Sequence, residues 1–98
     1  MTFPGWVQKA RSKKAQASAR LRYIMYKLAI EHTPTGSIRG LCETCKLGSH
    51  TTVSLYISQG AFSQHLAERF EERFGSAIIT AAQLVAPLDI PTEAKPSK

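Results

Sequence analysis

Two cysteines and two histidines have the most versatile side-chain chemistry in this sequence. Cys42 and Cys45 form a C-x-x-C pair, His50 follows five residues later, and His65 lies further along the chain. This set has the ligand types and the opening spacing of a zinc site, and a cysteine near a histidine could also form a nucleophilic pair. Burial is the simpler interpretation, because residues three apart share a helix face and free cysteines are among the most buried residues. We therefore expect two reduced cysteines in the core, with no metal ion and no cofactor.

Signatures of catalysis are otherwise missing from the sequence. There is no glycine-rich phosphate loop and no paired-carboxylate pattern, and no third group is recognisable that would orient a Cys–His pair. We therefore expect that the protein is not an enzyme.

Short hydrogen-bonding side chains fill the segment from residue 49 to residue 60. Val53, Tyr56 and Ile57 recur at the spacing of one helix face, while the other positions are mostly short and polar. Such a helix can approach the base edges of DNA closely, and each polar side chain can donate or accept a hydrogen bond. The segment is typical of the recognition helix of a helix-turn-helix domain, with residues 37–47 as its bracing helix. The predicted base contacts are Ser49, His50, Thr51, Thr52, Ser54 and Ser58.

Positive charge is concentrated near the N-terminus. Residues 1–30 contain seven Lys and Arg and no Asp or Glu, whereas residues 31–98 contain six bases and seven acids, so the excess of +6 comes from the first part. Residues 1–20 are expected to form a basic arm, or a helix extension, that binds DNA phosphates, and the release of counterions from the DNA favours this binding. A solvated helix face is the alternative, and a membrane-surface helix fits less well because the apolar residues there are mostly alanine. The predicted phosphate contacts are Lys9, Arg11, Lys13, Lys14, Arg39 and Lys46.

Five helices are expected to position these side chains. Leu21, Ile24, Met25 and Leu28 follow the spacing of a first core helix, which could extend back through the alanine-rich and lysine-rich stretch and stops near His32.

Cap residues indicate where the later helices begin. Ser37 and Ser49 are suitable N-caps for the second and third helices, and Gly60 suits the end of the third. A fourth helix is predicted within residues 61–75, and Thr80 with Gln83 has the form of a capping box that begins a fifth. The fourth carries apolar residues four apart that are expected in the core, and these are Phe62, Leu66, Phe70 and Phe74.

The length of 98 residues allows one domain, over residues 21–90, followed by a tail at 91–98 with the composition of a disordered end. A domain near the small end of stable cores favours self-association, so a homodimer is expected. Reduced cysteines, no visible signal peptide and no membrane span predict a cytoplasmic, nucleoid-associated protein.

From residue 38 to residue 90 the chain resembles the Cro and lambda-repressor-like class of helix-turn-helix proteins, and in particular the YdaS-type prophage regulators. The resemblance rests on HTTVSLYISQG in the position of the recognition helix, the small residue Gly60 at the end of that helix, the HLAERFEERFG helix and the ITAAQLVAPLDI ending. One spacing departs from that class, because Val53 follows Cys42 by eleven residues instead of ten, which predicts a turn one residue longer.

The resemblance implies a lambda-repressor-like domain of five helices that acts as a phage or prophage transcription regulator, most simply a repressor on double-stranded DNA. The predicted recognition helix, about Ser49–Ser58, would lie in the major groove. The alternative hypothesis is an antitoxin or another protein-interaction module. Such a module would bind a protein partner, either a toxin or a regulator, through the fourth helix and the C-terminal segment. The aromatic side chains of the fourth helix would then be partly exposed.

Overall fold

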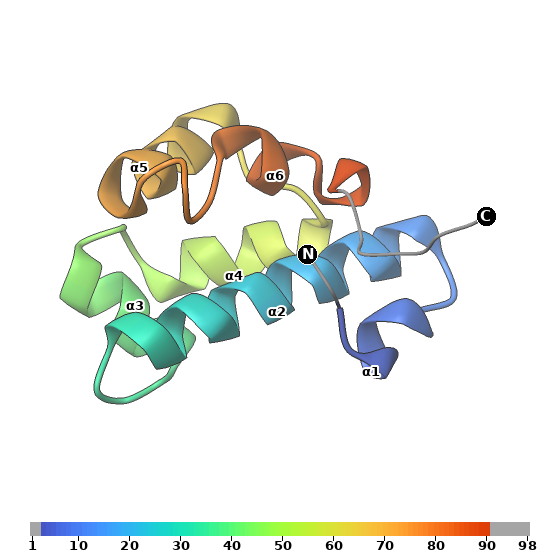
Figure 1. Ribbon diagram of the computed structural model, residues 1–98, viewed down its shortest axis with the longest axis horizontal. Helices are drawn as coiled ribbons and strands as arrows, with labels where there is room; N and C mark the ends of the chain where they lie inside the picture. Colours follow the sequence, from blue (N-terminus) through green and yellow to red (C-terminus); the bar gives the residue numbers. More distant parts are fainter. Residues whose placement is uncertain (1–2, 91–98) are drawn as a thin grey trace.

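The computed structural model describes residues 3–90, which form helices joined by short turns, with no strand among them. The elements are α1 (Gly5–Gln8), α2 (Lys13–His32), α3 (Ile38–Cys45), α4 (His50–Gln59), α5 (Gln64–Phe74), α6 (Ala81–Val85) and the short 3₁₀ turn η1 (Pro87–Asp89). The long helix α2 is central, with α5 and α6 above it and α1 beneath one of its ends (Figure 1). The prediction of an all-α fold is confirmed, with one more short helix than expected. The predicted tail lies outside the described residues.

The helix α2 begins at Lys13 because the Ser12 side chain accepts a hydrogen bond from the Ala15 backbone N–H at 3.0 Å. It ends at His32, as predicted, and the extended Thr33 follows, just before Pro34. Of the two forms considered for residues 1–20, the structure has a helix extension over residues 13–20. The four residues predicted to face the core are buried, namely Leu21, Ile24, Met25 and Leu28.

The N-terminal residues also belong to the folded body. Phe3 and Val7 are buried, Val7 completely, and the Phe3 ring packs edge-on against Tyr23 with centroids 5.7 Å apart. The Arg20 guanidinium lies 4.8 Å from the centre of the Phe3 ring and donates a hydrogen bond to the Pro87 carbonyl at 3.0 Å. The core therefore extends beyond the expected start at residue 21. Arg20 holds η1 onto α2 and is not a free charge on an arm.

Ser37, Ser49 and Gly60 bound α3 and α4 as predicted, but α3 ends at Cys45, two residues before the predicted end at residue 47. Ser37 accepts from the Gly40 N–H at 3.0 Å, and Ser49 accepts from the Thr51 N–H at 3.2 Å. Lys46 after α3 and Gly60 after α4 are left-handed. Four residues, 46–49, separate the two helices.

The helices α5 and α6 form the upper layer and pack against each other. The capping box of α6 is present, and the Glu71 carboxylate of α5 accepts a hydrogen bond from the Ala81 N–H at 2.7 Å. The apolar residues predicted for the fourth helix are buried, which confirms their place in the core; Phe62 lies just before α5, and Leu66, Phe70 and Phe74 lie on it. The protein-interaction hypothesis required these aromatic rings to be partly exposed, and they are not.

Candidate nucleic-acid interface

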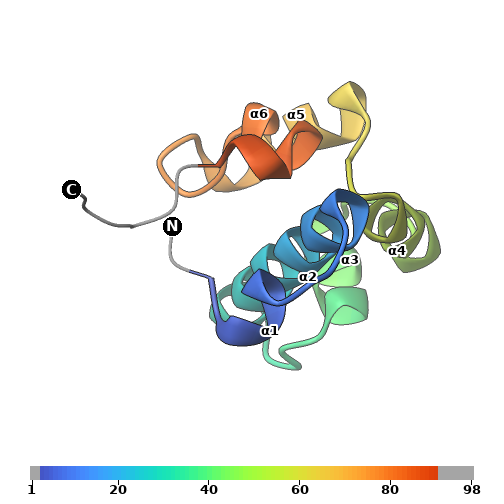
Figure 2. The same ribbon diagram turned by 90° about the vertical axis from the view of Figure 1, so that its right-hand side faces the viewer.

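The helix α4 lies at one edge of the molecule, beside α2 and on the side away from α1 (Figure 2). Val53 and Ile57 are buried against the core, and the half-buried Tyr56 ring lies 6.1 Å from the Phe62 ring, measured between centroids. The buried residues hold one side of α4, so its other side is free. All six side chains predicted to contact bases are exposed, and they are Ser49, His50, Thr51, Thr52, Ser54 and Ser58.

The helical turn of 100° per residue orders these positions around α4. Thr51, Leu55 and Ser58 are centred opposite the buried side, with Ser54 beside them. Ser49 is less available than the others, because its hydroxyl oxygen accepts the capping hydrogen bond from Thr51. The structure therefore brings the middle of the predicted set onto one outward face and leaves Ser49 at its margin.

Leu55 is a residue of this face that the sequence analysis missed. Its side chain is 56% exposed between Thr51 and Ser58, although nearly every other leucine in the described chain is buried. Gln59, also exposed, is its polar neighbour on the last turn. The signal was present in the helical spacing, but only polar residues were considered as candidates for base contacts.

Cations gather beside the turn that precedes α4. The Arg69 side chain of α5 donates to the Lys46 carbonyl at 3.0 Å, and Arg73 lies one helical turn further along. Lys46, Arg69 and Arg73 line one open hollow of about 270 Å³, together with Glu72, Cys45 and Leu47. The sequence analysis identified Lys46 alone, because the contact with Arg69 joins residues 23 positions apart and leaves no local pattern.

Arg39, on the first turn of α3, pairs with Glu43 at 3.3 Å, and both side chains are more than 60% exposed. A solvent-exposed pair of this kind contributes little stability, in the range of about 0–1 kcal/mol. Arg39 can therefore leave Glu43 for a stronger anion, such as a phosphate, at small cost.

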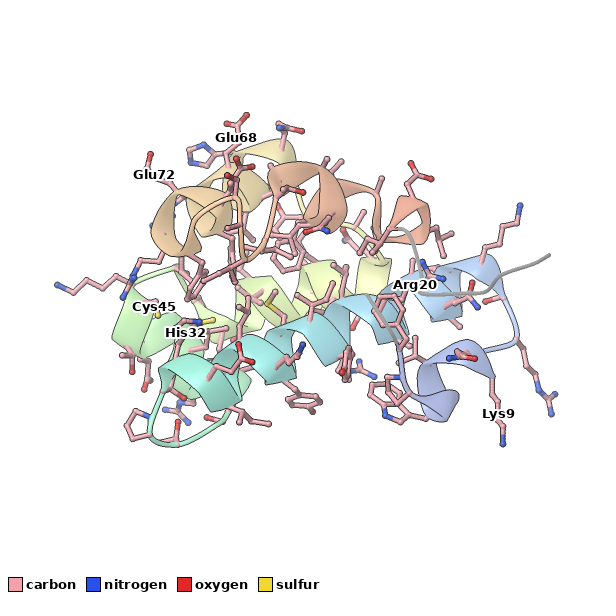
Figure 3. All side chains as sticks on the ribbon, viewed as in Figure 1. Lys9, Arg20, His32, Cys45, Glu68 and Glu72 are labelled. Atoms are coloured by element: carbon pink, nitrogen blue, oxygen red, sulfur yellow. The ribbon has the colours of Figure 1, made fainter. Side chains whose placement is uncertain are left out.

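The N-terminal bases are divided between two places. Lys14 is close to the C-terminal end of α4, because a side-chain carbon built on Gly60 would lie 3.4 Å from the Lys14 carbonyl oxygen, and Lys13 precedes it. Lys9 follows α1 and points away from the body of the molecule (Figure 3), and Arg11 is exposed nearby. The predicted phosphate contacts thus flank α4 at both ends, but Lys9 and Arg11 lie apart from them.

Acidic side chains occupy the upper layer of the molecule. Glu68 and Glu72 of α5 point upward, away from α2 (Figure 3). The hollow lined by Glu68, Glu71 and Glu72 would repel a polyanion, although α5 also carries Arg69 and Arg73. The free side of α4 carries no acidic side chain, and α4 has Lys46 in the turn before it and Lys14 near its last residue.

The cysteines do not form a reactive pair on the surface. Cys42 and Cys45 are both buried and reduced. Burial raises the pKa of the Cys42 thiol, and the nearby Cys45 and Glu43 raise it further, so the neutral thiol is favoured. Within residues 3–90, no three His, Cys, Asp or Glu side chains lie close enough together to hold a metal ion.

Comparisons with known proteins leave the family open, since no protein family, curated protein or solved structure matches the chain. Over residues 3–90, none of the helices combines the length and the apolar character needed to cross a membrane.

Proposed function

We propose that the protein is a sequence-specific transcription regulator that binds double-stranded DNA by placing α4 in the major groove. The observation that supports this proposal is the free face of α4. It carries hydroxyl and amide side chains with one leucine and no Lys, Arg, Asp or Glu, on a helix held from behind by buried Val53 and Ile57. The major groove is about 12 Å wide and accepts an α-helix, and short side chains let the helix approach the bases.

The residues of this face have distinct roles in the proposal. Thr51, Ser54 and Ser58 exchange hydrogen bonds with base edges, because a hydroxyl can both donate and accept. Leu55 packs on the methyl group of a thymine, an apolar feature that only the major groove presents. Its side chain still has about half of its surface to lose, so burial there contributes on the order of 1 kcal/mol.

Phosphate contacts on either side orient the helix. Arg39, Lys46 and Arg69 contact DNA phosphates on one side of the major groove. Lys13 and Lys14, at the opposite end of α4, contact phosphates on the other side. Such contacts position a protein without reading sequence, and they weaken steeply with salt.

Regulation then follows from occupancy of an operator, in the manner of a phage or prophage repressor, which is the class that residues 38–90 resemble. The protein acts in the cytoplasm at the nucleoid and requires no cofactor and no catalysis. As a homodimer it reads two half-sites about 10 base pairs apart, or a multiple of that spacing.

Selection from a pool of random DNA duplexes tests the proposal. We expect a defined motif to emerge, and two inverted copies of it if the dimer binds. With Leu55→Ala, the preference for one A·T pair in each half-site disappears, while Ser76→Ala, an exposed change outside α4, leaves the motif intact. A pool that stays random after repeated rounds contradicts the proposal.

A further inference from the structure

A cluster of exposed apolar side chains on the other side of the molecule is not used by the proposed function. Among residues 3–90, three of the six exposed large hydrophobic residues belong to α1 and α2. They are Trp6, Tyr26 and Ile30, which are 51%, 43% and 69% exposed. Tyr23, Tyr26 and Ile30 follow one another at helical spacing, and the Trp6 ring packs edge-on against Tyr23 with centroids 6.4 Å apart. We call these four residues, of which Trp6 comes from α1, the outer face of α2.

The helix α1 covers only part of α2. Phe3 and Val7 are buried, and the Phe3 ring packs against Tyr23, so this part of the chain covers α2 around Tyr23. Ile30, in the second half, remains the most exposed large hydrophobic residue of the described chain. Single exposed apolar residues are normal, but several together beside polar surroundings are typical of a binding surface.

Basic side chains border this face. Arg22 and Lys27 are exposed on α2 beside it, and Lys9 is exposed after α1. Glu31 is the only acid on α2 and lines the same hollow as Lys27, and residues 1–30 contain no acid, so the bases outnumber the acids around this face. The surface therefore complements a partner that combines apolar side chains with negative charge.

A second copy of the chain fits the face poorly. Ala17, which contacts the end of α4 at Gly60, precedes Tyr26 by nine positions, which places the two residues on opposite sides of α2. Figure 2 likewise shows α1 and α4 on different sides of α2. A dimer formed through the outer face would turn its two recognition helices away from each other and bring Arg22 and Lys27 near their own copies.

We propose that the outer face of α2 binds an acidic amphipathic helix of another protein. The apolar side of that helix covers Tyr26 and Ile30, and its carboxylates meet Arg22 and Lys27, so that one amphipathic helix packs along another. Because this face is remote from α4, the partner can bind while the protein is on DNA. The surface is thus a second site, which would link the proposed regulator to another protein.

The chain's single tryptophan, Trp6, reports on binding directly. The probe is a synthetic helical peptide of about five turns with leucine along one side and glutamate elsewhere, and its matched partner has lysine in place of glutamate. We expect saturable binding and a blue shift of Trp6 emission with the glutamate peptide only. Ile30→Ser should weaken binding by about tenfold, whereas Leu88→Ser, an exposed change on η1, should not alter it.

Several outcomes would overturn this proposal. They are equal binding of the lysine peptide, a Trp6 shift with phosphatidylglycerol vesicles but not with the glutamate peptide, self-association that Ile30→Ser abolishes, or no binding at millimolar peptide. DNA binding by Ile30→Ser is measured in parallel and should be unchanged. Failure of the outer face is thereby distinguished from failure of the proposed function, which would appear in wild-type DNA binding.

Discussion

Gly60 determines how closely the end of α4 approaches α2, and the substitution Gly60→Ala measures that contact. Gly60 is left-handed, with φ at 84°, and a side-chain carbon there would lie 3.2 Å from the Ala17 Cβ and 3.4 Å from the Lys14 carbonyl oxygen. The left-handed conformation costs an alanine roughly 1–2 kcal/mol, and crowding a packed contact adds about 1–2 kcal/mol. We expect Gly60→Ala to lower the free energy of unfolding by about 2–4 kcal/mol in total.

Gly48→Ala is the matched control, because Gly48 also has a positive φ, 100°, but a side-chain carbon there would meet nothing within 4 Å. This change should lower the free energy of unfolding only by the cost of the left-handed backbone conformation, roughly 1–2 kcal/mol. Urea unfolding followed by circular dichroism gives both values, and the midpoint for Gly60→Ala should fall by about 1–2 M. Equal losses for the two variants would refute the close packing of α4 on α2, and with it the placement of Lys14 beside the recognition helix.

Two further predictions concern DNA and pH. The double variant Thr51→Ala, Ser54→Ala should reduce the preference for an operator over random DNA by about tenfold or more. The double variant Lys13→Ala, Lys14→Ala should weaken the affinity for both DNAs alike and flatten its salt dependence, as measured by fluorescence anisotropy. The opposite assignment of effects would contradict the roles of these residues. Because the pKa of Cys42 is raised in the folded state, the folded protein holds this proton more tightly than the unfolded chain, so stability is full below the ordinary cysteine pKa of about 8.5 and declines as the pH rises above it. Chemical unfolding between neutral and alkaline pH should show this decline in the wild type, and a decline of the same size in Cys42→Ala would mean that the Cys42 thiol is not its source.

The helices could be predicted from the sequence because their signals are local. Ser37, Ser49 and the capping box at Thr80 each satisfy backbone N–H groups within three residues, and Gly60 has the positive φ that its residue type favours. Apolar spacing identified the buried sides of α2, α4 and α5 for the same reason.

The N-terminus and the cation cluster could not be predicted, because both depend on contacts between residues far apart in the sequence. Arg20 reaches the Pro87 carbonyl across 67 positions, and Arg69 reaches the Lys46 carbonyl across 23. Residues 1–20 therefore looked like a free basic arm, although Phe3 and Val7 anchor them in the core. Leu55 is a different case, since its place on the outward face follows from helical spacing alone.

The central claim, that α4 reads DNA sequence, is tested most directly by fluorescence anisotropy. The wild-type protein is titrated onto the DNA just upstream of its own gene, with scrambled competitor, over a series of salt concentrations. We expect binding that survives excess competitor and a preference for the upstream DNA that persists as salt rises. Equal affinity for both DNAs, lost together as salt increases, would contradict the claim, because basic side chains alone would then account for the binding.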